Sequence, residues 1–225
     1  SQEFAIFLGR LVGLAVRHHL HLALDLSLLV WRPLVKVPLS LKHLATVDSL
    51  AATQLEEVIS KGRKLEEAVK AGEHLDPNFV PEEWVDLTFT SYLSDGSRLP
   101  LVSGGLDLAV NFGNWREYVA LAEQARLQES AVVLRAFREG LASVLPIELF
   151  PLFTPSELEH MICGSREVDI DAIWRSAEYE GFEDSDELVQ SFWAVLRELS
   201  SEEKTLFVRF VWARSRLPSL AKELP

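Results

Sequence analysis

Apolar residues recur at helical spacing from the first residues of the chain. Between residues 4 and 16 the apolar positions include Phe4, Phe7, Leu8, Leu11, Leu14 and Ala15. Steps of three and four residues place these side chains on one face of a helix. Gly9 and Gly13 would let another backbone approach that helix closely. The pattern predicts a buried helix at the start of the chain, so we expect the chain to be a fragment of a larger domain.

Capping residues and apolar stripes predict further helices. Asp48 or Ser49 can cap a helix that carries the apolar residues of 50–59, and a charged helix over 61–71 ends at Gly72. From Trp115 onward the pattern is helical almost to the end of the chain. The later helix starts are predicted at Pro155, Ser185, and Ser200 or Ser201.

In one region, apolar and polar residues alternate instead. Val85, Leu87 and Phe89 would face one side of a strand over residues 85–92, with polar residues between them. Asp95-Gly96 then supplies a turn into a second strand over 98–102. The predicted fold class is therefore mainly α (α+β), with a short β-hairpin inserted among the helices.

Composition limits the classes of partner. The 225 residues are 48% hydrophobic and 25% charged, as in soluble globular proteins, and the formal net charge is −12. A negative surface repels phosphate backbones and anionic lipid, so we expect no nucleic acid and no membrane as partners. The apolar segment at 4–16 is too short to cross a bilayer and lacks the features of a signal peptide. We expect a cytoplasmic or nuclear protein.

Acidic residues are concentrated in one segment. Residues 156–187 contain eleven Asp and Glu residues, against Arg166 and Arg175. The simpler interpretation is a solvated face at helix starts. The alternative is an electrostatic landing surface for a basic partner.

Candidate chemistry within the chain is sparse. His18, His19 and His21 lie together, but helical spacing brings only two of them to one face, so we expect no metal site there. Cys163 is the one cysteine, which excludes an internal disulfide and suits a reducing compartment. It stands before Gly164 at a predicted helix end, away from the groups that activate a thiol, and we interpret it as a buried structural residue. A phosphate-binding glycine loop is absent from the sequence, and no cofactor is expected.

Short recognisable patterns occur along the chain at residues 7–15, 87–89, 95–96, 114–119, 136–140, 152–159, 162–164, 179–181, 192–193 and 210–218. Each is weak alone, but together they span nearly the whole chain. Taken in order, they resemble the HECT family of E3 ubiquitin ligases, and the last is similar to large HERC-like members.

The resemblance implies a position within a two-lobed catalytic domain. The family's N-lobe binds a ubiquitin-charged conjugating enzyme (E2), and its C-lobe carries the cysteine that accepts ubiquitin. This chain resembles most of the N-lobe, and Cys163 matches an N-lobe cysteine rather than the catalytic one. The implied division is a large helical subdomain over 1–40 and 120–218, a small E2-binding subdomain over 41–119, and the start of an interlobe linker over 219–225.

The resemblance also implies an E2-binding groove. It carries over to Ala51, Gln54, Leu55, Val85, Leu87 and Tyr118. Ala51 and Leu55 are four residues apart and share a helical face, and Val85 and Leu87 would share a strand face. The alternative is that all six simply pack in the core or the hairpin. Ala51 is smaller than the family's usual apolar residue, which predicts a shallower groove.

The implied function is the N-lobe of a HECT E3 ubiquitin-protein ligase, with E2 and ubiquitin as partners and a protein substrate bound outside this chain. Alone, the chain is expected to bind without ligating, and to need no catalytic residue, metal or cofactor. Two alternatives stay open: a helical scaffold or adaptor of similar shape that recruits no E2, and an enzyme that depends on Cys163.

Overall fold

The computed structural model describes residues 1–165 and 168–212, and these are mostly helical. The elements are α1 (Gln2–Arg17), α2 (Leu28–Leu34), α3 (Leu41–Leu44), α4 (Ser49–Lys70), the 3-10 helix η1 (Glu82–Trp84), β1 (Thr90–Tyr92), β2 (Arg98–Pro100), α5 (Trp115–Gln128), α6 (Ala131–Ala142), the 3-10 helix η2 (Ile147–Leu152), α7 (Pro155–Cys163), α8 (Ile170–Ser176), α9 (Glu187–Glu198) and α10 (Ser201–Trp212). The strands β1 and β2 form a two-stranded antiparallel sheet. The mainly α prediction with one small hairpin is confirmed.

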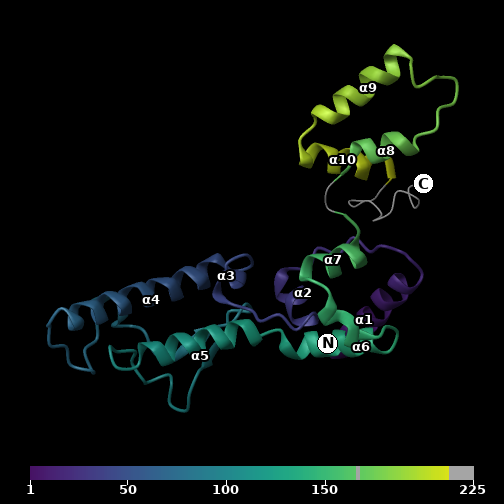
Figure 1. Cartoon of the computed structure of the whole chain (residues 1–225). Helices are drawn as coiled ribbons and strands as arrows, with labels where there is room; N and C mark the ends of the chain where they lie inside the picture. Colours follow the sequence, from purple (N-terminus) through teal and green to yellow (C-terminus); the bar gives the residue numbers. More distant parts are fainter. Residues whose placement is uncertain (166–167, 213–225) are drawn as a thin grey trace.

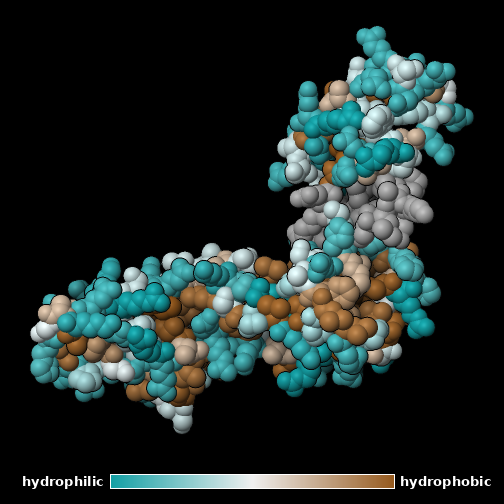
Figure 2. Space-filling view, viewed as in Figure 1, coloured by the Kyte–Doolittle hydropathy of each residue, from teal (hydrophilic) through white to brown (hydrophobic). Residues whose placement is uncertain are grey.

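The helices form three groups along an elongated molecule (Figure 1). An arm contains α4, α5 and the hairpin; the middle contains α1, α2, α6 and α7; and α8, α9 and α10 lie together at the other end. Each group has its own cluster of buried residues. We call the cluster of the middle group the first core, that of the arm the second core, and that of α8, α9 and α10 the third core. The space-filling view shows polar residues over much of the surface, with hydrophobic patches along the arm and the middle (Figure 2).

The first core depends on a close crossing of α1 and α6. A Cβ atom built on Gly9 would lie 2.1 Å from the carbonyl oxygen of Phe137, and one on Gly140 would lie 2.1 Å from that of Ile6. Neither position can therefore hold a side chain without separating the helices.

The predicted helix at the chain start is present, but the face predicted to be buried is wrong in most positions. Phe4, Phe7, Leu11 and Leu14 are exposed, and the buried residues of α1 are Ala5, Gly9, Val12, Gly13 and Ala15. The close approach of α6 at Gly9 selects the face with the small residues rather than the one with the large apolar side chains.

The second core joins α4 to α5 and the hairpin. Trp84, Phe89 and Trp115 are buried here, and Trp115 packs against Gly62 at a distance that excludes any side chain at residue 62. Asp48 caps α4 by accepting a hydrogen bond from the Ala51 N–H at 2.9 Å. The predicted cap is thus confirmed, but α4 runs unbroken to Lys70 where two helices were predicted. Lys, Arg and Glu favour helix strongly enough to continue it between the two apolar segments.

The third core contains the buried side chains of Ile173, Trp193 and Val208 from three successive helices. The predicted division of the chain did not separate this cluster from the first core. Its boundaries (1–40, 41–119 and 120–218) stay a prediction, and residues 219–225 lie outside the described residues.

The predicted strand over residues 85–92 is wrong in its first half. Trp84 is buried, and the chain around it turns, with the Trp84 N–H bonded to the Pro81 carbonyl and the Leu87 N–H to the Trp84 carbonyl, both at 2.9 Å. Val85 ends this 3-10 turn, so Val85 and Leu87 share no strand face. Thr88 forms an isolated bridge with Ala109, and the hairpin strand begins at Thr90. Burying Trp84 requires a turn, which alternation alone could not indicate.

Two further features bear on function. Cys163 is fully buried at the end of α7, and Gly164 follows it with a φ of 78°, as expected for a glycine that ends a helix. Among the described residues, no helix combines the length and apolar character that crossing a membrane requires, and no group of three or more His, Cys, Asp or Glu side chains is arranged to hold a metal ion.

Candidate functional site

The arm contains a hollow of about 770 Å³ between α4 and the segment that leads into the hairpin. Residues of α4 line one side and residues between 83 and 93 line the other. The side chains of Tyr118, Ala122 and Arg126, on α5, complete the lining. The hollow is therefore assembled from three parts of the sequence that lie far apart along the chain.

The helix α4 supplies both a floor and a rim. Leu55 and Val58 are buried in the second core, whereas Ala51 is half-buried and Gln54 is exposed. Ala51, Leu55 and Val58 follow one another at steps of four and three, so one stripe of α4 passes from the rim into the floor. The Asp48 cap fixes where this stripe begins.

The opposite part of the floor is aromatic. Tyr118 is buried and meets Phe89 edge to face, with ring centroids 5.7 Å apart. Burial raises the pKa of the Tyr118 phenol above its usual value of 10.0, so the ring presents a neutral hydroxyl at physiological pH. Trp84 is buried beside it.

Five of the six predicted groove residues line this hollow: Ala51, Gln54, Leu55, Leu87 and Tyr118. The sixth, Val85, is 63% exposed and is not among the lining residues. Its place in the prediction came from the strand that the 3-10 turn replaces. Leu55 and Tyr118 also belong to the second core, so the core-packing alternative holds for them in part, while Ala51 and Gln54 stay accessible.

Two exposed apolar residues of the hollow were not predicted. Leu50 is 69% exposed on α4 and Tyr92 is 64% exposed on β1, and both line the hollow. Leu50 lies one helical turn before Gln54, so its spacing could have signalled it. Tyr92 falls on the polar side of the predicted alternation, and no sequence signal distinguished it.

Charges of both signs border the hollow. Lys61 and Glu83 form an ion pair across it at 2.6 Å, and this contact holds the pKa of the Glu83 carboxyl below its usual value. Lys64, Arg98, Glu57 and Asp86 also line it. A balanced rim of this kind around an apolar floor resembles the anatomy of a protein–protein interface more than that of a site for a single ion.

Comparison with known proteins identifies the fold family. The model of the HECT-domain (ubiquitin-transferase) family matches residues 1–224. The chain belongs to this family. The resemblance noted in the sequence is thereby confirmed.

The relatives of this HECT chain include E3 ubiquitin-protein ligases. It is 36% identical over 212 residues to the E3 ubiquitin-protein ligase HERC2 of Mus musculus, and the matched region covers 94% of this chain and 4% of HERC2. It is 27% identical over 217 residues to the E3 ubiquitin-protein ligase HACE1 of Gallus gallus, covering 94% of this chain and 21% of HACE1. The chain therefore spans a small part of the length of these relatives.

Proposed function

We propose that this chain is the N-lobe part of a HECT E3 ubiquitin-protein ligase and docks a ubiquitin-charged E2 in the hollow of the arm. In the intact protein, ubiquitin would then pass by transthiolation to a cysteine outside the chain. The observation that supports the proposal best is the hollow itself, since five of the six residues carried over from the family line one accessible cavity.

The chemistry of the hollow suits a protruding loop with an aromatic or aliphatic side chain. The buried floor is apolar, and the exposed Leu50 and Tyr92 offer further contact area at its edge. Aromatic and aliphatic anchors that enter such hollows supply most of the binding energy at protein interfaces. Because half-buried Ala51 adds little surface to the rim, we expect transient binding of modest affinity.

The chain alone should bind E2 without transferring ubiquitin. Its cysteine is fully buried in the first core and lies at the C-terminal end of α7, where the helix dipole does not favour a thiolate. The protein substrate would be bound elsewhere in the intact ligase. The net charge of −12 continues to argue against nucleic acid and membranes as partners, and a cytoplasmic or nuclear location stays part of the proposal.

Substitution of Ala51 by Arg tests the proposal without disturbing the core. Ala51 is half-buried at the rim, so a long charged side chain would fill the opening while Leu55 and Tyr118 keep their packing. We expect Ala51→Arg to weaken E2 binding by about tenfold or more, measured by calorimetry against a panel of conjugating enzymes.

The matched control is Thr53→Arg. Thr53 is exposed on the same helix and does not line the hollow, so this variant adds the same charge elsewhere and should bind as the unaltered chain does. Equal binding by both variants would contradict docking in the hollow. Absence of binding to any E2 would favour the scaffold alternative, which the small side chain of Ala51 suggests. The other alternative is an enzyme that depends on Cys163. It would be contradicted if a Cys163→Ala variant kept whatever catalytic activity the unaltered chain has.

A further inference from the structure

A buried arginine lines the hollow and contacts three segments that are far apart in the sequence or belong to different elements. The side chain of Arg126, on α5, is only 5% exposed. Its Nη2 donates to Asp48 Oδ2 at 2.6 Å, its Nη1 donates to the Tyr92 carbonyl oxygen at 2.7 Å, and the same Nη1 lies 3.2 Å from Glu129 Oε2. One guanidinium group thus contacts the start of α4, the end of β1 and the end of α5.

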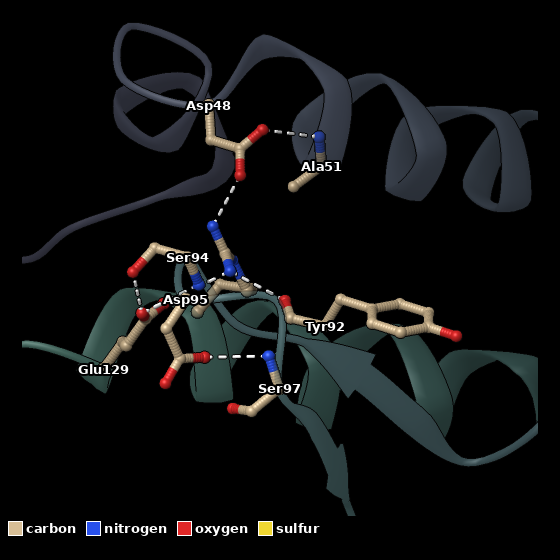
Figure 3. Close-up of polar contacts among 8 residues, drawn as sticks. Asp48, Ala51, Tyr92, Ser94, Asp95, Ser97 and Glu129 are labelled. Atoms are coloured by element: carbon tan, nitrogen blue, oxygen red, sulfur yellow. Dashed lines mark hydrogen bonds and ion pairs between the residues drawn. The ribbon is translucent and has the colours of Figure 1, made fainter.

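The partners of Arg126 are themselves attached to the rim. Asp48 uses its other oxygen to accept a hydrogen bond from the N–H of the rim residue Ala51, which caps α4 (Figure 3). Glu129 accepts hydrogen bonds from the backbone N–H and the hydroxyl of Ser94, at the base of the hairpin turn (Figure 3). We call Arg126, Asp48, Glu129 and the Tyr92 carbonyl the clasp.

Stability alone explains the clasp poorly. Desolvation of buried charges offsets most of their mutual attraction, so ion pairs of this kind add little net stability. In addition, the Arg126 Nε is buried and makes no hydrogen bond to any residue that the structure describes. An incompletely satisfied guanidinium is a costly way to hold two helices together. The guanidinium does fix the directions of its contacts, because its planar fork donates hydrogen bonds to its partners in one arrangement.

We propose that Arg126 is a positioning residue that sets the opening of the hollow. It holds α4 and the hairpin at a fixed separation, and through them the rim residues Ala51 and Tyr92. The inference rests on the proposed function in so far as the entering partner is a protein loop. Arg126 is buried, so it acts through Asp48, Glu129 and Tyr92 rather than by touching that partner.

The test compares Arg126→Met with Arg116→Met. Arg116 also joins α5 to α4, through a hydrogen bond from its Nε to Glu66 Oε1 at 2.7 Å, but this pair does not line the hollow. Asp48→Asn is a second variant, since Asn still caps α4 while losing the charge that faces Arg126. We expect Arg126→Met to weaken E2 binding by about tenfold, Asp48→Asn to weaken it less, and Arg116→Met to leave it unchanged.

A second measurement reports the opening without any partner. Spin labels on Thr53→Cys and Ser97→Cys would mark α4 and the hairpin turn at exposed positions, while Cys163 is buried. Electron paramagnetic resonance should give one narrow distance distribution for the unaltered arm and for Arg116→Met. It should give a broader or longer one for Arg126→Met.

Two results would overturn the inference: an unchanged label distance in Arg126→Met, or a loss of binding that Arg116→Met reproduces or that merely follows the unfolded fraction. Failure of the unaltered chain to bind any E2 has a different meaning. It would contradict the proposed function, and the clasp would then be judged on the label distance alone.

Discussion

At the scale of single residues, the floor of the hollow performs two tasks at once. Tyr118 and Leu55 are both 6% exposed and both line the hollow, so they hold the second core together while they shape the site. A variant that removes either side chain therefore changes folding before it changes recognition. Substitutions at the rim are more informative about docking.

Tyr118→Ala should show this directly. Removing a buried aromatic ring that contacts Phe89 edge to face should lower the free energy of unfolding by about 3–5 kcal/mol. Tyr118→Phe retains the ring and should cost less than about 1.5 kcal/mol. Denaturant unfolding measures both. Equal stability of Tyr118→Ala and the unaltered chain would contradict the assignment of Tyr118 to the core.

At the scale of helices and strands, the packing distance at a glycine determines whether a larger residue is tolerated there. Gly9 and Gly13 lie on the same helix, and alanine favours helix over glycine at both by about 1 kcal/mol. A Cβ at Gly9 would meet the Phe137 backbone oxygen at 2.1 Å, whereas one at Gly13 would meet the side chain of Val144 at 2.9 Å. A side chain can move aside more easily than a helix backbone.

We therefore expect Gly9→Ala to destabilise the chain by about 1–3 kcal/mol, since overpacking must separate α1 from α6. Gly13→Ala should be milder, because the gain in helix propensity offsets the adjustment of Val144. Thermal or denaturant unfolding of the two variants provides the comparison. A larger loss at Gly13 than at Gly9 would contradict the described crossing.

The hydrogen bonds at the start of α7 should make the stability of the fold depend on pH. The Thr154 side chain accepts from the Glu157 N–H, and Glu157 accepts from the Thr154 N–H at 2.8 Å, which lowers the pKa of the Glu157 carboxyl from its usual 4.5. A lowered folded pKa stabilises the fold above the unfolded value and loses that contribution as the pH falls through the folded one.

Unfolding measured as the pH falls from about 4.5 should therefore show a steeper loss of stability in the unaltered chain than in Glu157→Gln. Glutamine still accepts the Thr154 N–H but does not titrate. Parallel curves for the two proteins would show that this carboxylate adds nothing to the acid sensitivity of the fold.

The same scale shows what the sequence could and could not predict. Most helix starts were predicted correctly, because the cap Asp48 and the first-turn residue Pro155 act on their immediate neighbours. The strand at Val85 did not, because burial of Trp84 depends on α4 and α5, which are distant in sequence. The clasp likewise could not be predicted from the sequence, since Arg126 and Asp48 are 78 residues apart.

At the scale of the whole molecule, the acidic segment over residues 156–187 is largely used within the fold. Asp169 caps α8, Asp171 bonds Arg197 at 2.8 Å, and Asp184 accepts from Trp174 and Tyr179. These contacts support the interpretation of a solvated structural face. Arg166 and Glu167 lie outside the described residues, and a landing surface for a basic partner stays a hypothesis.

The elongated arrangement places the hollow at one end of the molecule, in the arm, and the helices α8, α9 and α10 at the other (Figure 1). A partner that docks in the hollow should therefore contact the arm and leave α8–α10 untouched. This spatial separation allows binding to be mapped as well as detected.

Nuclear magnetic resonance of the chain titrated with a conjugating enzyme provides the most direct test. The account predicts chemical-shift changes at the rim residues Ala51, Gln54, Leu87 and Tyr92, with the third core unaffected. Changes confined to α8–α10, or no change with any conjugating enzyme, would contradict the assignment of the hollow as the docking site.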